Sequence, residues 1–161
     1  MSTSTRTPRE LLFSGDVHAA RAAADALIAD DAIIAAARAE ATVVRGWALL
    51  AVGEPDAALE SFAESVESAR ESATDALAVE ALAGYAYCFL ADDPLAPAHG
   101  LVSESLARAN KLGDPALIAL GLRAKGAVAW ARCKFDEAEE AWTTALEHAL
   151  HAGDKRQASS A

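Results

Sequence analysis

The chain has 161 residues, of which 53% are hydrophobic, so it is long and apolar enough for one folded domain and is not a disordered protein. A formal net charge of −10 argues against a nucleic acid or an anionic membrane as partner, because both bind a basic surface. Alanine, the strongest helix former, accounts for 43 residues, and the composition therefore predicts closely packed helices.

The cysteines and the apolar runs bear on the compartment. Cys88 and Cys133 are too few for a disulfide framework, so we expect both to be reduced thiols. The N-terminal residues carry no secretory signal, and no apolar run reaches the ~18 residues that a membrane-spanning helix needs. We therefore expect a cytoplasmic protein, and the abundance of alanine and arginine is typical of GC-rich bacterial genomes.

The predicted helices come in pairs along the chain. Residues 1–8 are rich in serine and threonine, and we expect them to be disordered. A stub at Glu10–Phe13 and an alanine-rich run over 15–30 predict a partial pair over 9–30. The remaining segments are three full pairs, over about 31–73, 74–113 and 114–153, and a flexible tail over 152–161. The sequence thus predicts about seven main helices in a single domain over 9–151.

Residues that interrupt helices mark the boundaries. The two helices of each full pair are divided at Gly53-Glu54-Pro55, at Asp92-Asp93-Pro94 and at Cys133-Lys134-Phe135. Between pairs, Gly113 is predicted to close one helix in the left-handed conformation. Asp114 is predicted to cap the next helix, where Pro115 costs no hydrogen bond in the first turn.

Residue sizes recur with a period of 40 residues. The small columns are Gly46, Ala86 and Gly126; Ala58, Ala98 and Ala138; and Ser65, Ser105 and Ala145. The bulky columns are Phe62, Val102 and Trp142, and Val66, Leu106 and Leu146, and the column of breakers is Ala73, Gly113 and Gly153. A small residue at a helix crossing lets one backbone receive a bulky side chain from the other helix, so the columns indicate antiparallel helices that approach closely.

This pattern resembles the tetratricopeptide repeat family, whose second helix carries alanine, an aromatic residue four positions on and alanine three further. Ala138, Trp142 and Ala145 match that motif best. The resemblance implies an all-α fold, a right-handed α-solenoid of helix-turn-helix repeats. The period of 40 exceeds the ~34 residues of the common unit and is similar to the longer repeats of bacterial regulators; HEAT repeats are the structural alternative.

The resemblance also implies a concave groove, lined by the first helix of each pair, that binds a protein or peptide. Carried over by register, the groove residues are Glu40, Val43, Trp47, Leu50, Glu80, Tyr87, Leu90, Arg123, Ala127 and Trp130. Aromatic residues at helical spacing are equally typical of a core, so each of the three aromatic positions has that alternative.

The sequence contains no recognisable catalytic motif, and we expect neither enzymatic activity nor a cofactor or metal. His148 and His151 stand one turn apart near a helix C-terminus, where such side chains complement the helix dipole. The expected function is a non-catalytic interaction or scaffold module. The alternatives are a sensor of a small molecule or signalling peptide, such as the regulatory part of a larger bacterial regulator, and an enzyme with an unrecognised site.

The last predicted helix lacks a following helix to cover it. Trp142, Leu146 and Leu150 would then form an exposed apolar face. Such a face is covered by a second copy, by the curvature of the array or by another domain. We expect a homodimer through this helix, which a monomeric mass in light scattering at tens of micromolar would contradict.

Overall fold

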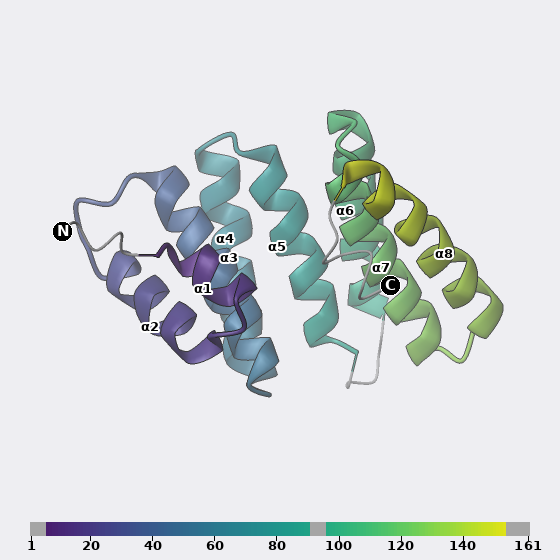
Figure 1. The fold of residues 1–161 in the computed structure, drawn as a ribbon, viewed down its shortest axis with the longest axis horizontal. Helices are drawn as coiled ribbons and strands as arrows, with labels where there is room; N and C mark the ends of the chain where they lie inside the picture. The colour runs from purple at the N-terminus through teal and green to yellow at the C-terminus, as the bar shows by residue number, and fades with distance from the viewer. Residues whose placement is uncertain (1–5, 91–95, 154–161) are drawn as a thin grey trace. The chain divides into compact units, whose positions relative to one another are not determined.

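The computed structural model describes residues 6–90 and 96–153, and these residues form helices and connecting turns without a strand. The eight helices are α1 (Pro8–Phe13), α2 (Val17–Ile28), α3 (Ala35–Ala51), α4 (Pro55–Glu71), α5 (Asp75–Cys88), α6 (Ala96–Leu112), α7 (Pro115–Ala131) and α8 (Phe135–Ala152) (Figure 1). The all-α class is thereby confirmed for the described residues. The seven expected main helices are α2 to α8, and the expected stub is α1.

The chain divides into two compact units, Met1–Thr74 and Asp75–Ala161. The division falls at the predicted boundary between the first and second full repeats. The single domain predicted over 9–151 stays a prediction.

In the first unit, each helix packs against the next one along the chain, and α1 also contacts α3. The unit begins with a capping box, in which Thr7 Oγ1 accepts a hydrogen bond from the Glu10 amide at 3.2 Å and Glu10 Oε2 accepts one from the Thr7 amide at 2.7 Å. Such reciprocal bonds satisfy amides that a helix start leaves free. The expectation of disorder through residue 8 is therefore corrected, because α1 begins at Pro8.

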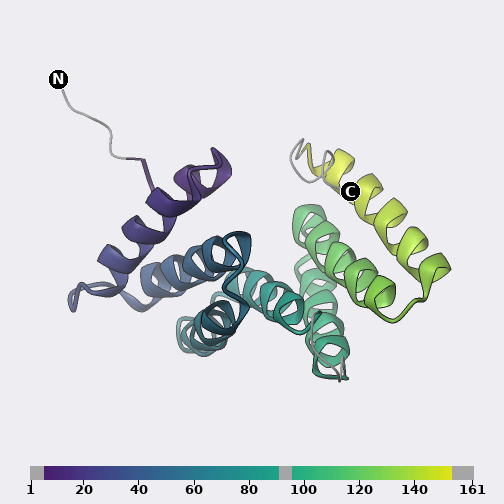
Figure 2. The ribbon, with the colours of Figure 1, turned by 90° about the horizontal axis from the view of Figure 1, so that it is seen from below.

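In the second unit, α5 packs against α6 and α7, α6 packs against α7, and α7 packs against α8. Two views show α7 and α8 side by side as an antiparallel pair (Figure 1, Figure 2). The predicted cap is confirmed, since Asp114 Oδ1 accepts hydrogen bonds from the amides of Ala116 at 2.8 Å and Leu117 at 3.3 Å. The predicted breaker Asp92-Asp93-Pro94 lies outside the described residues.

The breakers of the repeat share one backbone conformation. Ala73, Gly113 and Gly153 have φ values of 53°, 68° and 70°, which confirms the left-handed closure predicted for Gly113. The turn between α7 and α8 uses the same conformation at Cys133, with a φ of 57°. A residue other than glycine costs about 1 kcal/mol in this region. Ala73 and Cys133 therefore adopt a backbone conformation that their side chains disfavour.

The columns of small and bulky residues meet across each helix pair. A Cβ placed on Gly46 would lie 2.7 Å from the Phe62 ring, and one placed on Gly126 would overlap the Trp142 indole, coming within 2.8 Å of its Cε2. In the intervening repeat, Ala86 and Val102 belong to one buried cluster. Glycine thus stands opposite an aromatic ring in the first and third pairs, and alanine shares a buried cluster with valine in the second, which explains why the two columns vary together.

A second column provides hydrogen bonds between paired helices. Ser65 Oγ donates to the Ala39 carbonyl oxygen and Ser105 Oγ donates to the Val79 carbonyl oxygen, both at 3.0 Å and both buried. The third repeat has Ala145 at this position, with no hydroxyl to donate.

Replacing Ser105 with alanine is expected to lower the free energy of unfolding by about 1 kcal/mol, because one buried hydrogen bond is lost while alanine still fits the crossing. Urea unfolding followed by circular dichroism measures the change. Replacement of the exposed Ser103 with alanine is the control, and an equal loss in both variants would contradict the assignment of the stability to the buried bond.

Candidate functional site

Three aromatic side chains gather where α7 turns into α8. Trp130 lies in the last turn of α7, Phe135 is the first residue of α8, and Trp142 follows two turns later. The ring centroids of Trp130 and Phe135 are 4.9 Å apart, and those of Trp130 and Trp142 are 5.8 Å apart. Trp130 is 56% exposed and Phe135 53% exposed. We call Trp130, Phe135 and Trp142 the aromatic cluster.

The local sequence accounts for the position of each ring. Gly126 leaves room for the Trp142 indole, whose Nε1 donates to the Arg123 carbonyl oxygen at 3.2 Å. The left-handed Cys133 closes α7, and the Cys133 amide donates to the Trp130 carbonyl oxygen at 2.9 Å. The tight turn therefore brings Phe135 back onto Trp130, and the two rings meet edge to face.

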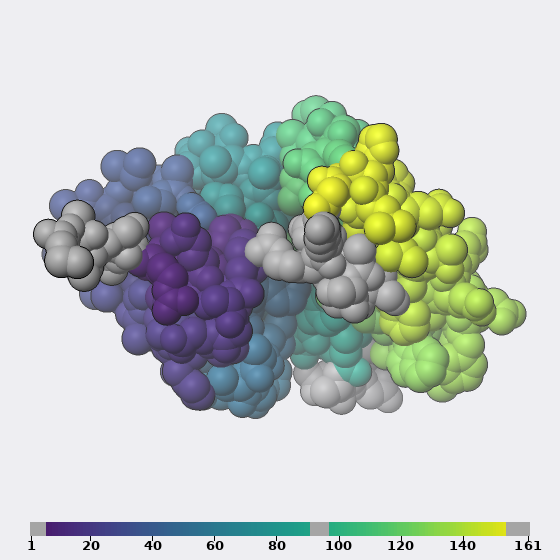
Figure 3. Space-filling view, in the orientation of Figure 1, coloured from purple at the N-terminus to yellow at the C-terminus, as the bar shows by residue number. Residues whose placement is uncertain are grey.

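An open hollow of about 350 Å³ lies over the cluster. Glu139, Thr143 and Leu146 of α8 complete its lining. In the space-filling view, α8 forms part of the surface that faces the viewer (Figure 3). The hollow thus offers a partner an apolar floor with a carboxylate at its border.

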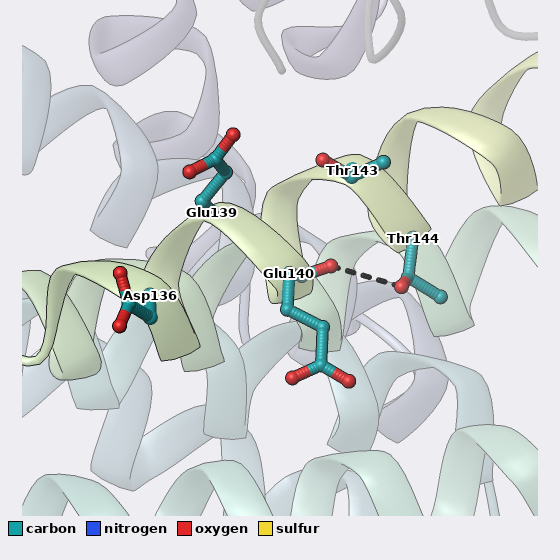
Figure 4. A pocket seen from close by; sticks show the side chains of 5 residues that line it. All are labelled: Asp136, Glu139, Glu140, Thr143 and Thr144. Carbon is teal, nitrogen blue, oxygen red and sulfur yellow. Dashed lines mark hydrogen bonds between the residues drawn. The ribbon is translucent and has the colours of Figure 1, made fainter.

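The neighbouring face of α8 is acidic. Asp136, Glu139 and Glu140 lie along it, and the side chains of Glu139 and Glu140 point away from one another (Figure 4). Thr144 Oγ1 donates to the Glu140 carbonyl oxygen at 2.9 Å and not to a carboxylate. Among residues 6–90 and 96–153, no three side chains of His, Cys, Asp or Glu gather so that they could hold a metal ion.

The groove residues predicted in the first unit have different surroundings. Val43 is fully buried, which corrects its assignment, because a partner cannot reach its side chain. Trp47 is half-buried and packs edge to face against Phe62, with ring centroids 5.3 Å apart. Glu40 is exposed, and its Oε1 accepts a hydrogen bond from Arg9 Nε at 2.8 Å. Leu50 is half-buried.

The groove residues predicted in the second unit lie on α5 and α7 or just beyond α5. Tyr87 and Leu90 are half-buried and pack against the core cluster that contains Ala83 and Val128. The others are Glu80, Arg123 and Ala127, which are half-buried, and Trp130, which is exposed. Because the predicted groove runs through both units, its continuity stays a prediction.

Burial raises the pKa of the Tyr87 hydroxyl above its ordinary value of 10.0, and the nearby Arg123 guanidinium lowers it by a smaller amount. The folded state therefore holds this proton more tightly than the unfolded chain does. Stability from this group is complete below pH 10 and declines as the pH rises through the raised pKa. We expect the decline in melting temperature above pH 10 to be shallower in Tyr87→Phe than in the wild type; identical slopes would contradict this.

The structure joins two predicted sites. Trp142 and Leu146, predicted for self-association, line the same hollow as Trp130, predicted for the groove. Leu150 is 64% exposed near the end of α8. Sequence reasoning missed Phe135, because the first residue of a helix rarely signals function. The one available signal was a comparison between repeats, since Pro55 occupies the equivalent position two repeats earlier.

No family model matches the chain, and no curated protein matches its sequence. No helix among the described residues is both long and apolar enough to cross a membrane. Over the described residues, the fold defines an all-α protein in which each helix packs against its neighbours along the chain within its unit.

Proposed function

We propose that this protein is a non-catalytic interaction module of the tetratricopeptide type that binds a protein or peptide at the aromatic cluster. The observation that carries the proposal is the exposure of Trp130 and Phe135, each more than half accessible beside a third ring. Aromatic residues in such a patch are enriched among the residues that dominate binding energy at interfaces.

The repeat supports the family part of the proposal. Glycine against an aromatic ring in two helix pairs, and alanine in one buried cluster with valine in the third, occupy positions 40 residues apart. A right-handed solenoid and a role as a scaffold in a bacterial cytoplasm belong to the same proposal.

The carboxylates on the α8 side of the cluster favour a basic partner. Glu139 borders the hollow, and Asp136 and Glu140 lie beside it on α8. An arginine or lysine of a partner could lay its apolar stem on the rings, with its cation over an indole face and close to a carboxylate. A second copy of α8 would instead bring like charges together, so we favour a basic segment over the homodimer, which light scattering tests.

Selection from a displayed library of random dodecamer peptides tests this function. We expect the wild type to enrich peptides that combine arginine or lysine with an apolar residue. Trp130→Ala combined with Phe135→Ala should reduce binding of the selected peptides by about thirtyfold or more, the effect of at least one hot-spot residue.

Replacement of Ile34 with alanine is the matched control, since this apolar side chain is 71% exposed but lies in the first unit. Circular dichroism of both variants shows that helicity is kept. If the double variant bound the selected peptides as tightly as the wild type, the aromatic cluster would not be the binding site. Enrichment of acidic peptides would contradict the proposal of a basic partner.

A further inference from the structure

We infer that the second unit holds a separate site for a small amphiphilic anion, a molecule with one carboxylate or phosphate and a short apolar chain. The site is a cleft of about 360 Å³ lined by α6, α7, the turn that follows α7 and the first turn of α8. This volume lies within the range of about 300–1,000 Å³ typical of small-molecule pockets. The cleft shares no lining residue with the hollow over the aromatic cluster, so the inference does not depend on the proposed function.

The charge of the cleft is opposite to that of the whole chain. Lys125, Arg132 and Lys134 line it, with His99 also in the lining, and Glu137 is the one carboxylate among its lining residues. We call this the basic cleft. Three permanent cations beside one carboxylate leave a local excess of positive charge on a chain whose net charge is −10. A cleft concentrates such a field and attracts anions.

The cations of the cleft already act on one carboxylate, that of Glu137. Its Oε1 accepts a hydrogen bond from Lys134 Nζ at 2.6 Å. That bond, together with the charges of Lys134, Arg132 and Lys125, holds the pKa of the Glu137 carboxyl below its ordinary value. A carboxylate from a ligand would meet the same three cations, and Glu137 would compete with it for Lys134.

The floor of the cleft is apolar. Val102 and Leu106 come from α6, and Val128 and Ala129 come from α7. An inorganic anion would use the cations alone, and a neutral alcohol would use the floor alone. A ligand with an anionic head and a short chain gains both contributions, which is the reason for the class that we assign.

Titration calorimetry with four probes tests the site: octanoate, octyl phosphate, octanol and inorganic phosphate. We expect octanoate or octyl phosphate to bind at least tenfold more tightly than octanol and than inorganic phosphate, and the tighter of the two identifies the preferred head group. Equal affinity for octanol would overturn the role of the cations, and equal affinity for inorganic phosphate would overturn the role of the apolar floor.

Three single variants locate the binding. Lys125→Glu should weaken the tighter-binding octyl probe about tenfold, which corresponds to about 1.4 kcal/mol. Lys111→Glu makes the same charge change on an exposed lysine of α6 outside the cleft and should leave the affinity within twofold. Glu137→Gln should tighten binding, because it removes the competing carboxylate. Equal losses in Lys125→Glu and Lys111→Glu would show attraction by net charge alone and would overturn the site.

Discussion

Replacing Gly126 with alanine is expected to lower the free energy of unfolding by about 3 kcal/mol, the upper part of the range for an overpacked core. The added Cβ would overlap the Trp142 indole, so either the ring must leave its place or α7 and α8 must separate. Displacement of the ring would also break the hydrogen bond from Trp142 Nε1 to the Arg123 carbonyl oxygen. Urea unfolding followed by circular dichroism measures the loss, and tryptophan fluorescence reports the displaced ring.

A compensating change makes this prediction specific. The second repeat already pairs Ala86 with Val102 at the equivalent positions, so Gly126→Ala combined with Trp142→Val copies a combination that the protein uses. We expect the double variant to be more stable than the sum of the two single losses by about 1–3 kcal/mol, as for residues in direct contact.

Gly100 provides the control for the intrinsic effect of alanine in a helix. It lies in α6, and a Cβ placed there would meet nothing within 4 Å. Gly100→Ala should therefore raise the free energy of unfolding by about 0.5–1 kcal/mol. Simple additivity of the Gly126 and Trp142 changes would contradict the contact between them.

The periodic pattern predicted the helix pairs, because small residues such as Gly46 and Gly126 in its columns mark direct contacts with a ring. A small residue at position 126 goes with a bulky one at position 142, because the Trp142 indole fills the space that Gly126 leaves. Helix caps were equally predictable, because they depend on adjacent residues: Asp114 could be identified as a cap from its position between Gly113 and Pro115. Where the sequence was misread, at residues 7 and 8, the missed signal was also local: threonine followed three residues later by glutamate is a capping box.

The candidate site was less predictable, because exposure depends on which other helices cover a residue. Register placed Val43 and Trp130 in the same groove, yet one is fully buried and the other is 56% exposed. The basic cleft gave no sequence signal, because its residues come from separate elements. Lys125 lies on α7, Arg132 and Lys134 lie in the turn after it, and part of the apolar floor comes from α6. Such clusters follow from packing and not from spacing along the chain.

Replacing Phe62 with alanine is expected to lower the free energy of unfolding by about 3–5 kcal/mol, the range for loss of a buried aromatic side chain. Phe62 is fully buried, it fills the space above Gly46, and it packs edge to face against Trp47. Gly46, the residue beneath the ring, has no side chain that could refill that space. Urea unfolding measures the loss, and amide hydrogen exchange should show faster opening in α3 and α4.

The pair at Gly46 and Phe62 allows the same compensation in the first unit. Phe62→Val leaves a smaller cavity than Phe62→Ala, and Gly46→Ala then adds a methyl group where the ring edge was. We expect the double variant Gly46→Ala with Phe62→Val to recover at least about 1 kcal/mol relative to Phe62→Val alone, the contribution of roughly one buried methyl group. In the wild-type background, Gly46→Ala alone should instead be destabilising, since its Cβ would lie 2.7 Å from the ring. A change that stabilises in one background and destabilises in the other would establish that the two columns encode one contact, and the same sign in both backgrounds would refute it.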